Sequence, residues 1–140
     1  MNAKRLIAAP VVVLLALTAC RSVPEQTGGR SPANVEAIEG SEVSRITLTG
    51  RAAERLGIET NPVRPSSGSR TVVPYSAIYY DAEGDTWVFV ESDGGYARAP
   101  VVVEAIEGER AILTAGPVPG TPVVVVGVAE LHGIEAGIGQ

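Results

Sequence analysis

The sequence predicts a small, mainly β domain, either a β-barrel or a β-sandwich, with one short helix. From residue 45 onward, short strand-like runs recur roughly every ten residues, and turn residues separate them, which is typical of small barrels and sandwiches. The 140 residues include 16 Gly and 10 Pro, a composition that disfavours a coiled coil. A folded part of about 95 residues buries enough surface to fold without disulfides.

The first elements lie at the start of this domain. Residues 45–49 alternate polar and apolar side chains, the pattern of a half-buried strand. Thr49 then caps a short helix over residues 50–56, and Gly57 ends it, because glycine readily adopts the left-handed conformation found after a helix.

A second group of strands follows. Residues 58–63 form a strand, which Pro62 confines to a sheet edge because proline has no N–H to donate. A loop over residues 65–69 leads to a further β stretch over residues 71–80, which Pro74 interrupts.

A hairpin is predicted next. Residues 81–85 are turn residues between two strand-like runs, and residues 86–91 form the second strand of the hairpin. Its alternation places Trp87 and Phe89 on one face and Val88 and Val90 on the other. The remaining strands are expected at residues 96–103, 109–114 and 123–126, with a mixed tail from residue 128.

The N-terminus has the pattern of an exported lipoprotein. A positive start precedes an apolar stretch from Leu6 to Ala19, which is shorter than the roughly 20 residues that a spanning helix needs. The stretch ends in Leu17, Thr18, Ala19 and Cys20, which resemble a bacterial lipobox of Leu, two small residues and the Cys that accepts lipid. An ordinary signal peptide with an incidental Cys is the alternative.

The lipobox resemblance implies cleavage before Cys20 and a diacylglycerol on its sulfur. Two or more acyl chains anchor a protein stably, whereas one chain binds reversibly. The 140-residue chain would lose its first 19 residues, leaving 121 residues without Lys and moving the net charge from −5 to −7. No polybasic run remains to hold lipid headgroups, so acylated Cys20 is expected to bind membrane lipid on the extracytoplasmic face of the cell membrane.

Residues 20–44 are expected to be the lipidated Cys and a flexible tether, because Gly, Ser, Pro, Glu and Thr dominate this stretch. A short strand or helical turn around Val35 is the alternative. The predicted organisation is thus a signal peptide over residues 1–19, the tether over residues 20–44 and the β domain over residues 45–140.

The composition argues against several functions. A single Cys allows no disulfide within the chain and no multi-Cys metal site, and a single His leaves few ways to build a zinc or copper centre. An acidic chain does not suit nucleic-acid binding. No nucleophile elbow or Ser-His-Asp set is visible, so we expect no catalytic residues, no metal ligands, no cofactor and no enzyme activity.

Other polar and aromatic groups are expected to be structural. His132 is predicted at the surface or a strand end. Asp81, Glu83 and Asp85 resemble a calcium loop only superficially, because its sixth position is not Gly and its twelfth is not Glu. Tyr79, Tyr80 and Trp87 are expected to pack in the sheet rather than stack on a ligand, and Glu104, Glu107 and Glu109 to form an exposed acidic turn.

Three stretches, in this order and spacing, resemble periplasmic adaptor subunits, also called membrane fusion proteins, of resistance-nodulation-division efflux pumps and some ABC exporters. They are residues 46–60, residues 73–90 with the segments VPYSAI and TWVFV, and residues 107–133 with the segment GPVPGTPVV. The last two resemble the opening and closing parts of the adaptor's membrane-proximal domain.

The chain also departs from these adaptors. Full adaptors carry a coiled-coil hairpin, a lipoyl-like domain and a β-barrel domain in the middle, where this chain has only a loop over residues 65–70. Because that family assembles its membrane-proximal domain from both chain ends, this sequence resembles those ends joined directly. Without the hairpin it lacks the part that meets an outer-membrane channel.

The resemblance implies a lipid-anchored accessory or truncated adaptor protein of a transmembrane efflux or export system, which docks on an inner-membrane transporter (permease). The alternative is an envelope lipoprotein that keeps the fold as a binding module without coupling to a transporter. The sequence assigns no partner-binding residues.

Overall fold

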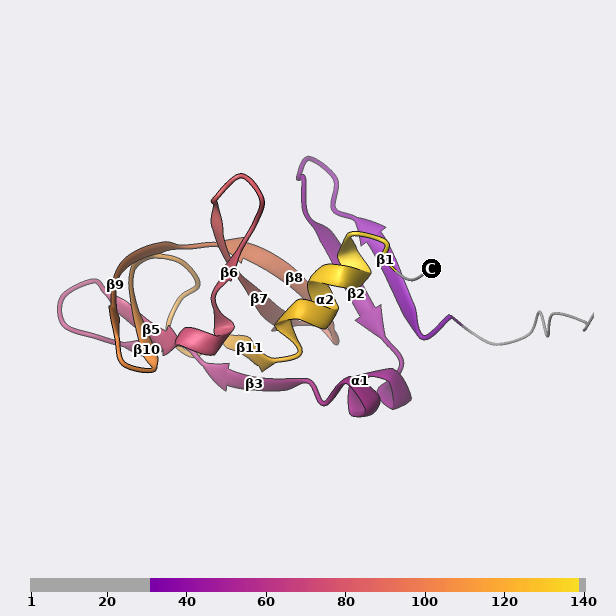
Figure 1. Cartoon of the computed structure of the whole chain (residues 1–140), viewed down its shortest axis with the longest axis horizontal. Coiled ribbons are helices and arrows are strands. Elements are labelled where there is room, and N and C mark those ends of the chain that lie inside the picture. The colour runs from indigo at the N-terminus through magenta and orange to yellow at the C-terminus, as the bar shows by residue number, and fades with distance from the viewer. Residues whose placement is uncertain (1–30, 139–140) are drawn as a thin grey trace, which may run out of the picture.

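A computed structural model describes residues 31–138. In this part of the chain, two antiparallel sheets and two short α-helices form a layered arrangement (Figure 1). The mainly β prediction is confirmed, and the arrangement is that of a small sandwich, because the sheets are not closed into a barrel.

The larger sheet has seven strands. Its order is β1-β2-β8-β7-β11-β3, with β6 pairing on β7. The bounds are Ala33–Ala37 (β1), Ser44–Leu48 (β2), Glu59–Pro62 (β3), Tyr79–Tyr80 (β6), Thr86–Ser92 (β7), Gly95–Pro100 (β8) and Pro122–Val126 (β11). Pro62 lies in an edge strand and β6 and β7 form a hairpin, as the sequence predicts, and in this hairpin Tyr79 pairs with Trp87.

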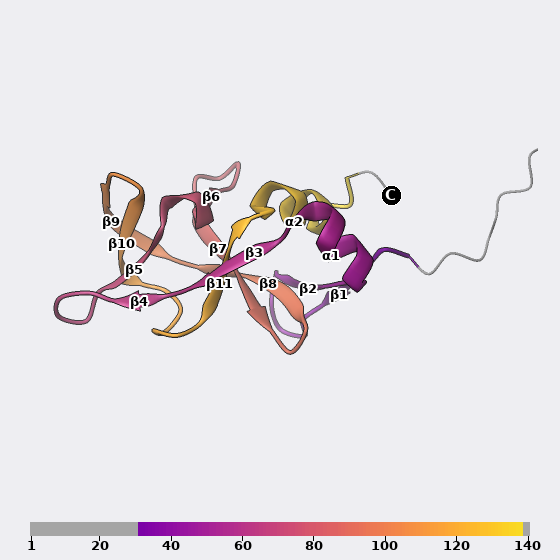
Figure 2. The same cartoon turned by 90° about the horizontal axis from the view of Figure 1, so that it is seen from below.

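The smaller sheet has four strands in the order β4-β5-β10-β9. They are β4 (Arg64–Pro65), β5 (Thr71–Pro74), β9 (Val102–Glu107) and β10 (Arg110–Ala115), and a short 3₁₀ turn, η1 (Tyr75–Ala77), follows β5. The chain crosses from the larger sheet to the smaller one at Val63 and at Val101, and both residues are buried. Figure 2 shows the smaller sheet at one end of the molecule and the helices at the other.

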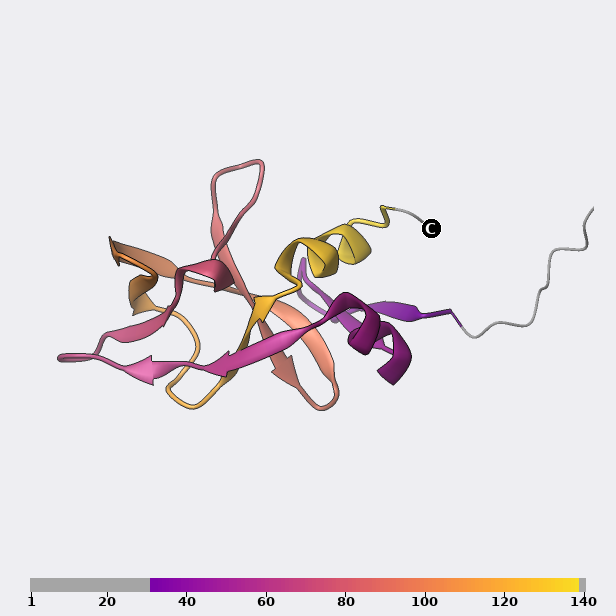
Figure 3. The same cartoon turned by 60° about the horizontal axis from the view of Figure 1, so that its bottom comes forward.

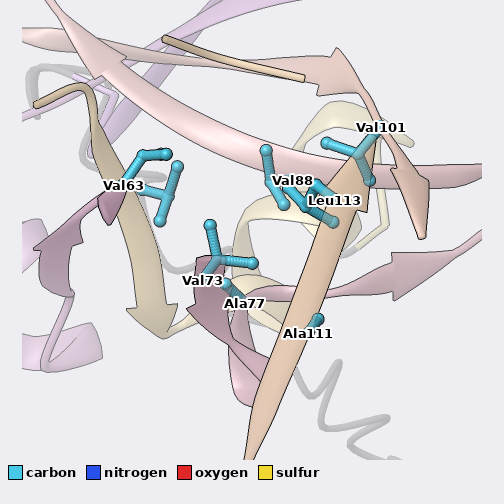
Figure 4. Close-up of a cluster of buried hydrophobic side chains, with 8 residues drawn as sticks. Val63, Val73, Ala77, Val88, Val101, Ala111 and Leu113 are labelled. Carbon is cyan, nitrogen blue, oxygen red and sulfur yellow. The ribbon is translucent and has the colours of Figure 1, made fainter. Parts of the chain in front are cut away.

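The core between the two sheets is small and aliphatic. It consists of Val63, Val73, Ala77, Val88, Val101, Ala111, Leu113 and Val123 (Figure 4). A second cluster covers the opposite face of the larger sheet and consists of Ile46, Phe89, Tyr96, Val124 and Leu131. The larger sheet is therefore packed on both faces.

Strands β7 and β11 contribute to both clusters. Neighbouring residues of a strand point to opposite faces, so Val88 and Val123 enter the first cluster whereas Phe89 and Val124 enter the second. The predicted split of Val88 and Phe89 between two faces is thus confirmed. These central strands carry apolar residues in unbroken runs because both faces of the sheet are packed there.

The two helices lie at one end of the molecule (Figure 3). The first, α1 (Gly50–Leu56), begins and ends where the sequence predicts. The second, α2 (Val128–Glu135), is not predicted, and the expectation of a single helix is wrong. Leu131 of α2 is fully buried against the larger sheet, and this tertiary contact stabilises a helix whose own sequence contains Gly133.

Strand β1 lies within the stretch that is expected to be a tether. It pairs with β2 over five residues, from Ala33 opposite Leu48 to Ala37 opposite Ser44. The tether expectation is therefore wrong for residues 33–37, and the alternative of a short strand around Val35 is correct. The pairing satisfies one edge of β2, whose Ile46 belongs to the second cluster.

Gly127 joins β11 to α2 and is held in a conformation that only glycine adopts easily. Its φ is 94°, and a Cβ at this position would overlap Cδ1 of Ile58. We expect Gly127→Ala to lower the free energy of unfolding by about 2–4 kcal/mol, from backbone strain plus the clash. Urea titration of the purified chain measures this loss.

Gly120→Ala is the matched control for this variant. Gly120 has nearly the same φ, 91°, but a Cβ there would meet no atom within 4 Å. It should therefore lose only the strain, about 1–2 kcal/mol. Equal losses in the two variants would contradict close packing of Ile58 on Gly127.

Candidate functional site

A well-formed hollow in the described part of the chain lies beside α1. This groove, here called the α1 groove, has a volume of about 490 Å³ and runs between the start of β1, helix α1 and the end of α2. Its apolar lining comes mainly from Ala33, Leu48, Leu56, Ile134 and Ile138. It is thus an open apolar depression with two arginines, Arg51 and Arg55, among its lining residues.

The sequence of α1 explains how these arginines are placed. Thr49 Oγ1 accepts a hydrogen bond from the Ala52 amide at 3.3 Å, which fixes the first turn. Ala52 is buried, so the helix rests on this face. Arg51 and Arg55 are four residues apart and exposed, and neither forms an ion pair within residues 31–138.

A polar cluster holds α2 against the sheet. The Tyr79 hydroxyl and Nε2 of His132 are hydrogen bonded at 3.0 Å, and the two rings lie with centroids 4.4 Å apart. The prediction of His132 at the surface or a strand end is wrong, because α2 turns it toward β6 and leaves it half-buried. Its Nδ1 is buried and has no hydrogen-bond partner among the described residues.

Arg98 extends this cluster toward the β1–β2 hairpin. Its guanidinium lies 4.6 Å from the ring centroid of Trp87, and its Nε is 3.3 Å from Glu135 Oε1. The same Glu135 oxygen accepts a hydrogen bond from the Ser44 amide at 3.1 Å. Because the Arg98 and Glu135 side chains are only 20% and 10% exposed, this ion pair is shielded from water. One arginine thus links β7, β8 and α2.

The aromatic residues of the β6–β7 hairpin take structural roles. Tyr79 packs on His132, and Trp87 packs under Arg98, so both belong to the polar cluster, whereas Tyr80 is half-exposed. Desolvation, followed by the negative charge of Asp81, raises the pKa of the Tyr79 hydroxyl above its ordinary value. Tyr79 is therefore neutral at physiological pH.

Asp81 organises the turn of this hairpin. One carboxylate oxygen accepts from the Asp85 amide and the other from Trp87 Nε1, both at 2.7 Å. Desolvation acts to raise the pKa of Asp81, but the hydrogen bonds from Trp87 and the turn amides outweigh it and hold the pKa below its ordinary value. Within residues 31–138, no three His, Cys, Asp or Glu side chains are placed to hold a metal ion.

The acidic stretch near the β9–β10 turn divides between two roles. Glu107 and Glu109 are exposed around the turn at Gly108, as predicted. Glu104 instead forms a bidentate ion pair with Arg70 of the β4–β5 loop. Arg70 Nη2 donates to Oε1 at 2.8 Å, and Arg70 Nε donates to Oε2. These hydrogen bonds lower the pKa of Glu104 below its ordinary value.

This ion pair predicts a dependence of stability on pH. Because the folded-state pKa of Glu104 is lowered, its contribution is present above the unfolded-state value, about 4.3, and is lost as the pH falls through the folded-state value. We expect Glu104→Gln to destabilise the protein slightly at pH 7 and to have no effect at strongly acidic pH. The urea concentrations at the midpoint of unfolding, measured from pH 7 to strongly acidic pH, test both expectations.

Glu107→Gln is the matched control for Glu104→Gln. Glu107 makes a single 3.5 Å contact with Arg110 on an exposed turn, so its removal should change the midpoints little at any pH. Identical pH profiles for the two variants would contradict the role of the Arg70–Glu104 pair.

The predicted lipobox lies outside the described residues. Leu17, Thr18, Ala19 and Cys20 fall in residues 1–30, so the structure does not place them. Among residues 31–138, no helix is long and apolar enough to cross a membrane.

The α1 groove and the contacts of Arg98 are not found by the sequence analysis. The four-residue spacings of Arg51 and Arg55 and of Ile134 and Ile138 are nevertheless visible in the sequence.

Comparison with protein-family models, with curated proteins and with solved structures finds no match to this chain.

Proposed function

We propose that this chain is a lipid-anchored, extracytoplasmic accessory or truncated adaptor protein of a transmembrane efflux or export system. The observation that carries the proposal is the lipobox-like segment Leu17–Cys20, placed shortly before a small β domain. Acylation of Cys20 holds such a domain at the membrane surface. The order and spacing of the three adaptor-like stretches support a transporter as the partner of this domain.

The short connection supports docking on a membrane protein. Eleven residue steps separate Cys20 from Ser31, the first residue of the described domain, and a fully extended chain spans at most about 40 Å over that number. The domain is therefore confined to a thin layer above the lipid. Proteins that share this layer, above all the extracytoplasmic parts of integral membrane proteins, are its available partners.

The edge strand β9 offers a docking surface for such a partner. It is hydrogen bonded to β10 on one side and is the last strand of its sheet on the other. Val102 and Ile106, near the two ends of this strand, are 56% and 44% exposed. An exposed edge with apolar side chains is suited to pairing with a strand of another chain.

Affinity capture tests the proposal. The tagged full chain is captured from detergent-solubilised membranes of cells that express it at a native level, and co-purified proteins are identified by mass spectrometry. We expect an integral-membrane permease to be enriched with the wild type and lost with Ile106→Arg, because the new charge opposes burial of β9.

Val118→Arg is the matched control. Val118 is 71% exposed and lies in the turn between β10 and β11, outside both sheets, so this variant should retain the permease. The absence of any permease over a Cys20→Ala sample would refute transporter coupling. That result would favour the envelope-lipoprotein alternative.

A further inference from the structure

We infer that the α1 groove is a membrane-contact surface, and that its end of the domain lies on anionic phospholipid. This inference rests on the lipid anchor of the proposed function, and it names which face of the domain meets the lipid. Three observations carry it: where the chain enters the domain, the charge of the groove lining, and the apolar residues left exposed there.

The chain enters the domain at the groove itself. Ser31 and Pro32, the first described residues, are part of the groove lining. In Figures 1 and 2 the start of β1, helix α1 and the end of α2 lie at the same end of the molecule, and the four-stranded sheet lies at the opposite end. An anchor at Cys20 is therefore attached to the groove end, which becomes the end closest to the bilayer.

The lining of the groove carries the opposite charge to the domain as a whole, because it contains two arginines and no acidic residue. Residues 31–138 carry 15 acidic side chains and seven arginines, so the domain as a whole is repelled by an anionic surface. Arg51 and Arg55 line the groove without an ion-pair partner among the described residues, and the only acidic side chain on α1 is Glu54. These two arginines of the lining orient the groove toward anionic lipid.

The apolar residues at this end match a lipid interface. Leu48, Leu56 and Ile134 line the groove and are only half-buried, and Ile138 is 71% exposed. A surface that combines arginines with exposed aliphatic side chains sits at the boundary between headgroups and acyl chains. No single polybasic run is needed, because the fold brings α1 and the end of α2 together.

A labelled chain tests the inference. An environment-sensitive fluorophore is attached to Ile138→Cys in the mature chain, whose own Cys20 sulfur is acylated, and the protein is reconstituted in vesicles of phosphatidylcholine and phosphatidylglycerol. We expect nitroxide-bearing lipid to quench this label strongly. The same label at Val118→Cys, an equally exposed position at 71%, should be quenched little. Equal quenching at both positions would overturn the inference.

Charge variants provide the second arm. Each basic residue near an anionic surface changes the binding constant about fivefold. The double variant Arg51→Gln/Arg55→Gln should therefore weaken binding of the groove to the vesicle surface about 25-fold. Arg64→Gln with Arg110→Gln removes the same charge from residues outside the groove and should leave the quenching unchanged. Quenching that does not respond to Arg51 and Arg55, or that is the same on pure phosphatidylcholine, would overturn the inference.

A third arm separates this inference from the proposed anchor. A hexahistidine tag replaces Cys20 and holds the chain on nickel-chelating lipid, so the label reports orientation without acylation. Preferential quenching at residue 138 in this arm supports the membrane-contact surface even where Cys20 proves not to be acylated in cells. Equal quenching at residues 138 and 118 in this arm overturns it even where acylation is demonstrated.

Discussion

Replacement of Cys20 by Ala is expected to move the protein entirely from the membrane fraction to the soluble fraction. The wild type should pellet with membranes and resist a carbonate wash, because two or more acyl chains, each contributing about 0.8 kcal/mol per buried CH₂, hold it there. Alanine has no sulfur to accept lipid. Fractionation followed by immunoblotting measures the change, and labelling with a radioactive or alkyne fatty acid shows whether the chain is acylated.

Thr18→Ser is the matched control for Cys20→Ala. Serine keeps a small residue at the position where a lipoprotein signal peptidase needs one, so this variant should be acylated and should remain in the membrane fraction. A Cys20→Ala protein that still pellets after the carbonate wash would refute the lipid anchor. Such a result would support an uncleaved apolar segment as the anchor.

Local rules of sequence account for most of the fold. The helix α1 begins and ends where Thr49 and Gly57 predict it, since a side-chain oxygen and a left-handed glycine satisfy its terminal groups. The β6–β7 hairpin follows from the turn residues between two alternating runs. These features depend on neighbours within a few residues, which is why the sequence alone was sufficient.

Two elements lack a strong local signal. Helix α2, which was not predicted, has a weak helical pattern of its own, and it is stabilised because Leu131 packs in one cluster with Phe89 and Ile46 of the larger sheet. Strand β1 was expected only as the alternative to a tether, and it is ordered by its pairing with β2, the next strand along the chain. The sequence of each element alone does not identify what it packs against or pairs with.

The candidate surfaces show the same limit. The α1 groove is assembled from the start of β1, the helix α1 and the end of α2, which are separated by up to about a hundred residues of chain. The half-buried position of Arg98 also depends on several segments at once, because Trp87, Glu135 and the Glu42 carbonyl surround it. A basic residue in a strand pattern does not reveal such partners.

Replacement of Phe89 by Ala should cause the largest loss of stability in the described domain. Phe89 is fully buried and belongs to the cluster that joins the larger sheet to α2. Truncation of a buried Phe costs about 3–5 kcal/mol, through lost transfer energy and the cavity it leaves, out of the 5–15 kcal/mol typical of a whole domain. Urea titration followed by the fluorescence of Trp87, the one Trp of the chain, measures the loss.

Two further variants determine whether this loss reflects attachment of α2. Val118→Ala, at a 71% exposed position, should change stability by less than about 0.5 kcal/mol. Leu131→Ala removes the α2 side chain from the same cluster, so its effect and that of Phe89→Ala should combine to less than their sum, since each leaves the other side chain partly unsupported. Strict additivity would mean that Phe89 and Leu131 do not share a packed cluster, and that α2 is held chiefly by the polar contacts of His132 and Glu135.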